Sequence, residues 1–203
     1  MNARPNSEER RRLVIGITGA SGAIYGVRLL ELLKETDIET HLIMSRAARM
    51  TLAYETDFKV PDVERLATLV HPYENIGAVC SSGSFRTMGM VIAPCSIKTM
   101  SEIATGVTGN LLSRAADVAL KERRRVILLL RETPLHLGHI RTMAAVTEAG
   151  AIVYPPVPAF YSRPASLAEM VDHTLCRVLD LFDVDLGKMR RWSGERGRSE
   201  SQP

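Results

Sequence analysis

Cysteine is scarce in this sequence, and the three that are present, Cys80, Cys95 and Cys176, lack the spacing of a redox or zinc motif. The sequence therefore predicts neither a disulfide framework nor a metal site. Long hydrophobic runs are also absent, because no apolar stretch approaches the roughly 20 residues that a membrane-spanning helix needs. The basic segment 1–12 is not followed by the small-residue cleavage site of a signal peptide. We expect a cytoplasmic protein without membrane insertion.

The sequence has no strong excess of charge of either sign. Lys and Arg number 26 against 23 Asp and Glu, and a formal net charge of +3 is too small to indicate nucleic-acid binding. The basic clusters at 10–12, 123–125 and 190–191 are interpreted as solvated surface. Aromatic residues make up only 5% of the chain, but an apolar fraction of 45% over 203 residues is enough for one substantial core.

Short runs rich in Val and Ile alternate with longer segments of helical periodicity, which is typical of a parallel sheet covered by helices on both faces. We predict the α/β class, as a Rossmann-like (flavodoxin-like) three-layer sandwich with a mainly parallel sheet. Strands are expected at 13–18, 40–44, 90–93, 126–130 and 151–154. Helices are expected at 23–35, 46–54, 97–104, 111–121, a segment ending near 149, and 167–182. A single domain over 12–192 is predicted between disordered ends at 1–11 and 193–203.

Glycines and serines follow three of the predicted strands, at the edge where open parallel sheets bind ligands. Gly19, Gly22 and Gly26 lie between the first strand and a helix, so backbone amides and the positive end of that helix can face a phosphate. Three hydroxyl groups at strand ends are compatible both with helix capping and with contact to a phosphate or flavin: Ser21, Ser45 and Ser96. Their joint placement favours one anionic ligand.

Charged residues at two further places allow structural and functional interpretations. Arg114 and Lys121 are seven residues apart on one face of a predicted helix. Asp117 lies between them and can pair with Arg114, so a structural salt bridge is a serious alternative. Arg131 and Glu132 leave a buried strand directly, which is a typical place for a functional ion pair.

Several other residues are weaker signals. Three prolines predict a stiff loop over 155–161, in which Tyr161 either donates to an anion or packs in the core. Glu55 is interpreted by default as a solvated carboxylate at a helix end. His136 and His139 have the spacing of two metal ligands, but no third ligand follows at zinc spacing, so metal binding is not predicted. Cys95 could be a nucleophile near a helix start, but we interpret it as a small buried residue, which is the commoner case.

The motifs belong to a series of blocks along the chain: Thr18-Gly19-Ala20-Ser21-Gly22-Ala23, Glu55-Thr56-Asp57, Ser81-Ser82-Gly83-Ser84-Phe85, Pro94-Cys95-Ser96, Arg114-Ala115-Ala116-Asp117-Val118, Leu120-Lys121-Glu122-Arg123, Arg131-Glu132-Thr133-Pro134-Leu135 and Pro158-Ala159-Phe160-Tyr161. In order and spacing these blocks resemble the UbiX-type flavin prenyltransferases, from about residue 13 to 192. The segment 131–139 resembles the branch of that family linked to ubiquinone biosynthesis. The segment 139–143 differs from relatives linked to phenolic-acid decarboxylation.

The resemblance implies a reaction in which dimethylallyl phosphate gives its prenyl group to N5 and C6 of reduced FMN, without a metal. Phosphate is released, and the prenylated FMN serves a separate UbiD-type decarboxylase. The resemblance assigns FMN binding to Ala20, Ser21, Gly22, Ser45, Ser96, Ile97, Lys98, Thr99 and Arg131. It assigns binding of dimethylallyl phosphate to Arg114, Lys121, Glu132, Tyr161 and Arg177. The implied catalytic residues are Ser21, Glu55, Lys121 and Glu132. The family is generally a homododecamer with sites at subunit interfaces.

Three other functions remain as alternatives. An FMN-dependent cysteine decarboxylase of the related fold should carry an active-site histidine and a Pro-x-x-Asn motif, where this chain has Pro94-Cys95-Ser96-Ile97. A nicotinamide-dependent oxidoreductase should carry an acid after the second strand, where this chain has Ser45. A non-enzymatic FMN carrier has no evident need for a second phosphate pocket.

Overall fold

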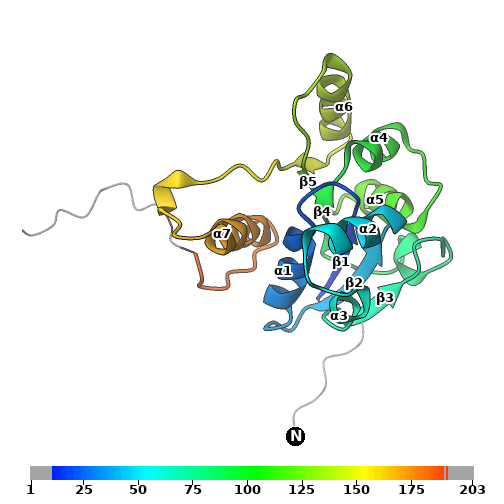
Figure 1. Cartoon of the computed structure of the whole chain (residues 1–203). Coiled ribbons are helices and arrows are strands. Elements are labelled where there is room, and N and C mark those ends of the chain that lie inside the picture. Colours follow the sequence, from blue (N-terminus) through cyan, green and yellow to red (C-terminus); the bar gives the residue numbers. More distant parts are fainter. Residues whose placement is uncertain (1–10, 190, 192–203) are drawn as a thin grey trace, which may run out of the picture. The chain divides into compact units, whose positions relative to one another are not determined.

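A sheet of six parallel strands is the centre of the computed structural model, which describes residues 11–189 and 191 (Figure 1). The strand order is β3-β2-β1-β4-β5-β6, with bounds β1 (Arg12–Ile17), β2 (Glu39–Met44), β3 (Leu69–His71), β4 (Gly89–Cys95), β5 (Arg125–Leu130) and β6 (Ile152–Val153). The predicted α/β class is confirmed, and every strand pair is parallel. The order is that of a Rossmann sheet rather than the flavodoxin-like 2-1-3-4-5 order, so the topological switch point lies between β1 and β4.

Seven α-helices connect or follow the strands in the described residues: α1 (Ala23–Leu33), α2 (Arg46–Glu55), α3 (Val60–Glu64), α4 (Ile97–Thr105), α5 (Leu111–Lys121), α6 (Leu137–Glu148) and α7 (Leu167–Asp180). Two short 3-10 turns add Val79–Ser81 and Phe160–Ser162. None of the described helices is long and apolar enough to cross a membrane.

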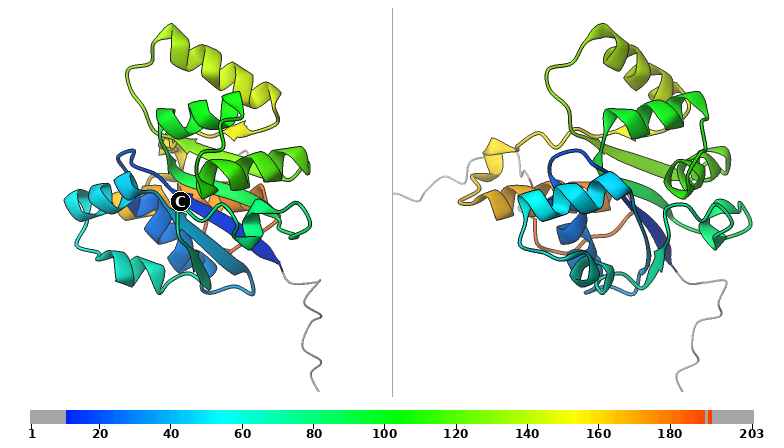
Figure 2. Two further views of the ribbon diagram at one scale, coloured as in Figure 1. Left: turned by 90° about the vertical axis from the view of Figure 1, so that its right-hand side faces the viewer. Right: turned by 45° about the vertical axis from the view of Figure 1, so that its right-hand side comes forward.

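The apolar runs become central strands because each buries side chains on both faces of the sheet. In β1, Val14 packs in one cluster with Leu112 of α5, while Ile17 lies against Gly26 of α1. Neighbouring side chains of a strand point to opposite faces, so a continuous apolar run serves both helix layers. Figures 1 and 2 show α1 and α5 on opposite sides of the sheet.

Two short elements were not predicted from the sequence. The strand β3 has only three residues, and Leu69 and Val70 in it are exposed, so it lacks the apolar run that marks the other strands. The helix α3 has five residues and begins with a proline in its first turn. The other strands and helices were predicted with bounds within a few residues of those observed.

The described chain divides into two compact units, one up to Pro156 and one from Val157 onward, and the division falls inside the predicted domain of residues 12–192. The first unit contains the sheet and α1 to α6. The second contains the 3-10 turn Phe160–Ser162 and α7. The ends predicted to be disordered, 1–11 and 193–203, lie outside the described residues apart from residue 11.

A chain of buried and half-buried polar side chains lies on the β1–β2–β3 half of the sheet. Nε2 of His41, which is 1% exposed, lies 2.9 Å from Oε1 of Glu39, and its Nδ1 lies 2.9 Å from Nε2 of His71. Since the carboxylate can only accept, His41 carries its proton on Nε2, and His71 must donate to its Nδ1. Glu39 also accepts from Arg12 at 3.3 Å. Burial lowers the pKa of both histidines, so both are neutral at pH 7.

We predict that mild acid destabilises the protein through this histidine pair. In the unfolded chain both histidines titrate near pH 6.5, above their lowered pKa values in the folded state. The unfolded state therefore takes up protons first, and the free energy of unfolding falls by up to about 1.4 kcal/mol per pH unit per histidine as the pH drops below about 6.5. Urea unfolding at fixed protein concentration between about pH 7.5 and 5.5 measures this loss. The His71→Gln variant keeps a hydrogen-bonding group towards His41 but does not titrate there. It should lose less stability, and an equal loss would contradict the assignment.

Candidate active site

The carboxyl ends of β1 and β4 are joined by Thr18, which is 1% exposed. Its hydroxyl donates to the carbonyl of Pro94 at 2.7 Å and accepts from the backbone amide of Ser96 at 2.9 Å. Beside it, the backbone amide of Ser45 donates to the carbonyl of Ile17 at 3.0 Å. These bonds bring the turn after β1 and the starts of α2 and α4 to one place, at the topological switch point where such sheets bind ligands.

A cleft of about 460 Å³ opens at this place, within the usual range for small-molecule sites. The first turns of α2 and α4 contribute Arg46 and Lys98 to its wall, so two positive helix ends and two cations meet there. The full lining is Thr18, Gly19, Ser45, Arg46, Ala47, Tyr73, Ser96, Lys98 and Thr99. This set of donors suits the phosphate of a nucleotide such as FMN.

The two serines at the cleft are helix caps as well as lining residues. Ser45 Oγ accepts from the backbone amide of Ala48 at 3.0 Å, and Ser96 Oγ accepts from that of Thr99 at 3.3 Å. The Ser45 hydroxyl serves its helix as an acceptor and so keeps its own proton for a further acceptor. The Ser96 hydroxyl donates its proton to Oγ1 of Thr99 at 3.2 Å. Capping and ligand contact, which the sequence left as alternatives, are therefore compatible at Ser45, whereas a ligand at Ser96 would have to replace the bond to Thr99.

Gly19 is required by the close approach of α2. A Cβ atom at this position would lie 2.4 Å from the Cβ of Ala47, a separation that real side chains do not reach. The backbone of the turn after β1 therefore lies directly against the first turn of α2. Any side chain at residue 19 would push α2 outward and widen the cleft.

The positive end of α1 is occupied by a carboxylate of the chain itself. Glu55, the last residue of α2, accepts from the backbone amides of Gly22 at 2.7 Å and Ala23 at 3.0 Å. Gly22 has a φ of 102°, in the left-handed region that favours glycine. The expectation that these amides face a phosphate is therefore corrected, and so is the default interpretation of Glu55 as a merely solvated carboxylate. An anion already fills this helix end.

The same carboxylate brings together two of the four predicted catalytic residues, Ser21 and Glu55, with Arg131 beside them. Partial burial opposes ionisation of Glu55, but hydrogen bonds from Ser21 and from two backbone amides, with the charge of Arg131, outweigh it and lower the pKa. Glu55 is therefore ionised at pH 7 and can accept a proton or a hydrogen bond. The structure thus brings Ser21, Glu55 and Arg131 to the carboxyl edge of the sheet.

Of the predicted FMN residues, Ser45, Ser96, Lys98 and Thr99 line the cleft. Ile97 belongs to the same first turn of α4 but is not among the lining residues. Ala20, Ser21 and Gly22 form the turn between β1 and α1, and Arg131 directly follows β5. The amide of Arg131 donates to the carbonyl of Cys95 at 3.1 Å, so that residue is tied to the end of β4.

The predicted prenyl-phosphate residues of the first unit do not gather at that cleft. Arg114 pairs with Asp117 at 2.8 Å, which is the structural salt bridge that the sequence allowed. Lys121 pairs with Glu122 at 2.5 Å, and Glu132 accepts from the amide that follows it at 3.0 Å. Lys121 precedes the start of β5 whereas Glu132 follows its end, so about 20 Å, the length of a six-residue strand, separates them. Within one chain they cannot bind the same phosphate.

The other two predicted prenyl-phosphate residues belong to the second unit. Arg177 pairs with Asp180 at 2.7 Å on α7. Tyr161 lies in the 3-10 turn, with its hydroxyl 3.3 Å from Nε2 of His173. Both side chains are about half exposed, so both are accessible to a ligand.

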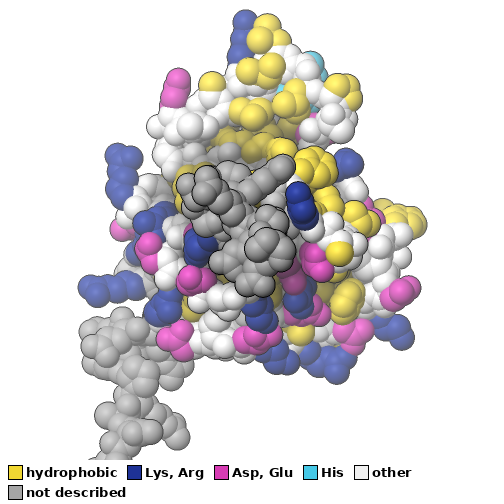
Figure 3. Space-filling model, turned by 90° about the vertical axis from the view of Figure 1, so that its left-hand side faces the viewer, with side chains coloured by type: hydrophobic (Ala, Val, Ile, Leu, Met, Phe, Trp, Pro, Cys, Tyr) yellow, Lys and Arg dark blue, Asp and Glu magenta, His cyan; other side chains and the backbone are white. Residues whose placement is uncertain are grey.

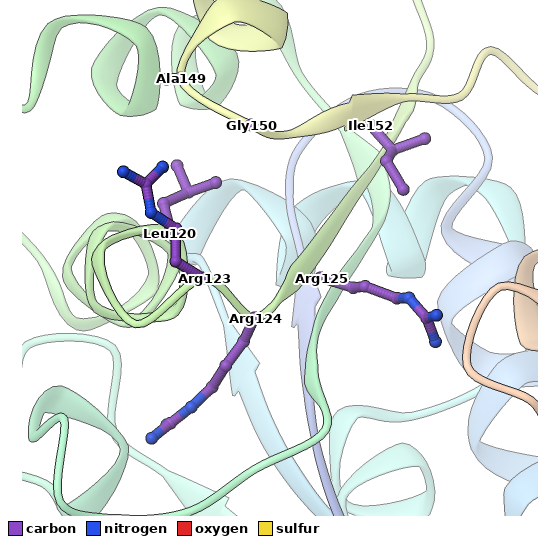
Figure 4. A pocket seen from close by; sticks show the side chains of 7 residues that line it. All are labelled: Leu120, Arg123, Arg124, Arg125, Ala149, Gly150 and Ile152. Atoms are coloured by element: carbon purple, nitrogen blue, oxygen red, sulfur yellow. The ribbon is translucent and has the colours of Figure 1, made fainter.

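A hollow of about 170 Å³ near the start of β5 is lined by three consecutive arginines, but they do not converge on an anion. Figure 4 shows Arg124 and Arg125 pointing in opposite directions. Arg124 donates to the carbonyls of Gly83 at 2.6 Å and Phe85 at 2.7 Å, so it holds the 81–85 segment in place. At least one arginine of the cluster, Arg124, therefore has a structural role.

Neither metal nor cysteine chemistry is indicated in the part of the chain that the structure describes. No group of three His, Cys, Asp or Glu side chains there is placed to hold a metal ion. His136 instead caps α6, since its Nδ1 accepts from the amide of Gly138 at 3.0 Å. Burial raises the pKa of Cys80 to about 11 and raises the pKa of Cys95 further, so both remain protonated thiols.

Sequence reasoning expected Gly19 near a phosphate but missed four residues that line the cleft: Thr18, Arg46, Ala47 and Tyr73. Three of these lie within two positions of predicted site residues, so widening each motif by one or two positions would have found them. Tyr73 comes two residues after β3, the strand that was not predicted. Without that strand, no sequence signal brings Tyr73 to the carboxyl edge.

Comparison with known proteins places this site in a known family. The family model described as Flavoprotein matches residues 1–192. The flavin prenyltransferase UbiX of Escherichia coli (strain K12) is 58% identical over 187 residues, which cover 91% of this chain and 99% of the relative. The crystal structure of AnUbiX in complex with FMN and dimethylallyl pyrophosphate is 48% identical, has a TM-score of 0.91, and covers 93% of this chain and 100% of its own.

A second solved structure is that of a dodecameric FMN-dependent UbiX-like decarboxylase from Escherichia coli O157:H7. It is 44% identical, has a TM-score of 0.88, and covers 90% of this chain and 100% of its own. Identity at this level over nearly the whole length leaves one assignment. The chain belongs to the flavoprotein family and, within it, to the UbiX flavin prenyltransferases.

Proposed function

We propose that this protein is a flavin prenyltransferase, which joins the dimethylallyl group of dimethylallyl phosphate to N5 and C6 of reduced FMN and releases phosphate. The observation that carries the proposal is the anion-binding cleft at the switch point of a chain 58% identical to a curated flavin prenyltransferase. When bound, reduced FMN supplies the two nucleophilic ring atoms. No metal takes part in this proposal.

The phosphate of FMN is held, in this proposal, by the starts of α2 and α4. There the hydroxyls of Ser45 and Ser96 and the cations of Arg46 and Lys98 line one cleft. The start of α1 is not used for this phosphate, because Glu55 already binds its amides. The residues that remain for the rest of the flavin are Ala20, Ser21, Gly22, Ile97, Thr99 and Arg131.

The chain's own charges suit departure of a phosphate from the prenyl donor. Negative charge grows on that phosphate as the carbon–oxygen bond breaks, and fixed cations and donors stabilise it. We assign this role to Lys121, Arg177 and Tyr161, with Arg114 and Glu132 in the same pocket. Glu55 is ionised at pH 7 and hydrogen-bonded to Ser21, so this pair can accept and pass on a proton at the carboxyl edge of the sheet.

We further propose that the site is completed by a second copy of the chain in a homododecamer. The separation of Lys121 from Glu132 by the length of β5 supports this, since one chain cannot bring both to one phosphate. Helix α6 buries only Val146, and exposed apolar side chains gather over it at the top of Figure 3. Leu137 and Ile140 on α6, and Leu135 just before it, are exposed. Exposed apolar patches of this kind mark protein contacts.

The product, prenylated FMN, would serve a UbiD-type decarboxylase, and the resemblance of segment 131–139 favours one in ubiquinone biosynthesis. A cytoplasmic location accords with three free cysteines, all of them buried. One similar solved structure is a UbiX-like decarboxylase. Decarboxylation, with release of carbon dioxide, is therefore the alternative activity to test.

The test is anaerobic incubation of the purified protein with reduced FMN and dimethylallyl phosphate, followed by mass spectrometry of the released flavin. A mass gain of one prenyl unit, absent without enzyme, is the expected result. A parallel reaction with the pyrophosphate determines the donor. Unmodified FMN from folded protein with both donors would overturn the proposal, and release of carbon dioxide from an added acid would favour the decarboxylase.

The Arg177→Ala variant should bind FMN normally but should bind dimethylallyl phosphate more weakly. Loss of a charge-assisted hydrogen bond to phosphate should raise the KM for the donor by roughly 10- to 100-fold. Steady-state kinetics and FMN titration measure the two effects separately. The matched control is Arg191→Ala, because Arg191 pairs with the same Asp180 at 2.8 Å but has no proposed role at the phosphate. Equal loss of both ligands would contradict the division of roles.

A further inference from the structure

Tyr73 brings a phenol hydroxyl to the cleft from the strand that lies beside β2. The strands β2 and β3 are parallel, with Ile43 opposite His71. Two residues beyond this pair, Ser45 and Tyr73 both line the cleft. The backbone of Tyr73 is also tied to α5, since its carbonyl accepts from the amide of Leu111 at 2.9 Å. Tyr73 therefore has a defined place at the carboxyl edge of the sheet.

The ring of Tyr73 is anchored, while its hydroxyl remains available to a ligand. The side chain is partly buried and packs against the hydrophobic core of the first unit. Among the residues that the structure describes, none forms a hydrogen bond with its Oη. Burial raises the pKa of Tyr73, so the phenol keeps its proton at pH 7. The hydroxyl can therefore donate to an anion that enters the cleft.

Two ion pairs lie close enough to Tyr73 to influence its ionisation. Arg46 pairs with Glu74 at 2.7 Å, and Lys98 pairs with Glu102 at 2.8 Å. Within the described chain, both carboxylates are thus bonded to cations, and neither takes the phenol proton. Each cation of the cleft wall has its own counter-charge, so the two pairs add little net charge. Binding of a phosphate there depends more strongly on uncharged donors such as the phenol, whose bond to an ionised acceptor is a strong one.

We propose that Tyr73 donates its hydroxyl proton to the phosphate of FMN and so determines specificity for phosphorylated over unphosphorylated flavin. This inference rests on the proposed binding of FMN at the cleft. The hydroxyls of Tyr73 and Ser45 would then hold the phosphate from the ends of two neighbouring strands. Because the ring is already packed against the core, little side-chain freedom is lost when FMN binds, which improves affinity.

The Tyr73→Phe variant removes the hydroxyl and keeps the ring against the core. It should raise the Kd for FMN by roughly 10- to 100-fold, because a hydrogen bond to a charged group is lost. The Kd for riboflavin, the same flavin without the phosphate, should not change. Fluorescence titration of the purified, flavin-free protein with each flavin measures both constants. The matched control is Tyr54→Phe, since Tyr54 is 85% exposed on α2 and is not among the residues that line the cleft. Its Kd for FMN should equal that of the parent protein.

Two results would overturn the inference. One is an unchanged Kd for FMN in the Tyr73→Phe variant. The other is an equal rise in the Kd for FMN and for riboflavin, because the hydroxyl would then act on the flavin ring or on folding and not on the phosphate. The prenyl-transfer reaction of the parent protein tests the proposed function separately. If prenylated FMN formed but Tyr73→Phe left FMN affinity unchanged, the function would stand without this contact, whereas a parent protein that bound neither flavin would overturn both.

Discussion

The Glu55→Gln variant should keep its FMN but lose about 100-fold or more in turnover, the range expected when a group that moves a proton is removed. Glutamine has the same size, and its amide oxygen can still accept from one backbone amide at the start of α1. It cannot take up a proton, and its NH₂ group would face the donors Gly22, Ala23 and Ser21, which now bond to the carboxylate. Formation of prenylated FMN under anaerobic single-turnover conditions measures the loss directly.

Glu64→Gln is a matched control for this variant. Glu64 is another carboxylate in the same region of the chain, and it pairs with Arg49 at 2.9 Å rather than with a helix end. Its turnover should equal that of the parent protein. The role of Glu55 would be disproved if Glu55→Gln turned over FMN as fast as this control, with the same flavin bound.

Chains carrying Lys121→Ala and chains carrying Glu55→Gln, each inactive alone, should recover activity when both are co-expressed in one assembly. Suppose that a site takes Lys121 from one copy and Glu55 from another. With random mixing of equal amounts, the copy that supplies Lys121 has an intact lysine in half of the sites, and the copy that supplies Glu55 has an intact glutamate in half of the sites. About one quarter of the sites, one half times one half, then have both groups. The physical reason is the position of Lys121 at the start of β5, a strand length away from the carboxyl edge. Turnover of purified mixed assemblies is the measurement.

The control pair is Arg131→Ala with Glu55→Gln. Both residues lie at the carboxyl edge of one chain, where the charge of Arg131 helps to lower the pKa of Glu55. Every site therefore receives both from the same copy, and mixing should restore nothing. Absence of recovery in the Lys121 pair as well would mean that Lys121 acts in its own chain or not at all.

Local pattern predicted the elements that carry the sheet, and long-range contacts explain what it missed. The helix α5 has the predicted bounds, because an asparagine cap at its start and an apolar stripe define it locally. Ser45 and Ser96 were recognised as helix starts for the same reason. The strand β3 is only three residues long and partly exposed, so it has no comparable signal. Tyr73, which follows this strand, was therefore not predicted as a site residue.

The candidate site was predictable only where its residues are close in sequence. Glu55 reaches the start of α1 across 33 residues, and no local rule links a helix C-terminus to the amides of another helix. The pairing of Thr18 with the segment after β4 spans 78 residues. The blocks proposed a set of residues but not which of them would meet in one chain, because that depends on how β5 separates the residues before its start from those after its end.

The carboxylate at the start of α1 acts as a permanently tethered competitor for that helix end. Chain connectivity gives Glu55 an effective concentration on the order of millimolar or more at the amides of Gly22 and Ala23. A free anion must displace the Glu55 carboxylate to bind at these amides. The exchange replaces one negative group by another, so the electrostatic gain is small. The phosphate released in each turnover is therefore kept off this helix end, so accumulating product should not inhibit the enzyme at that position.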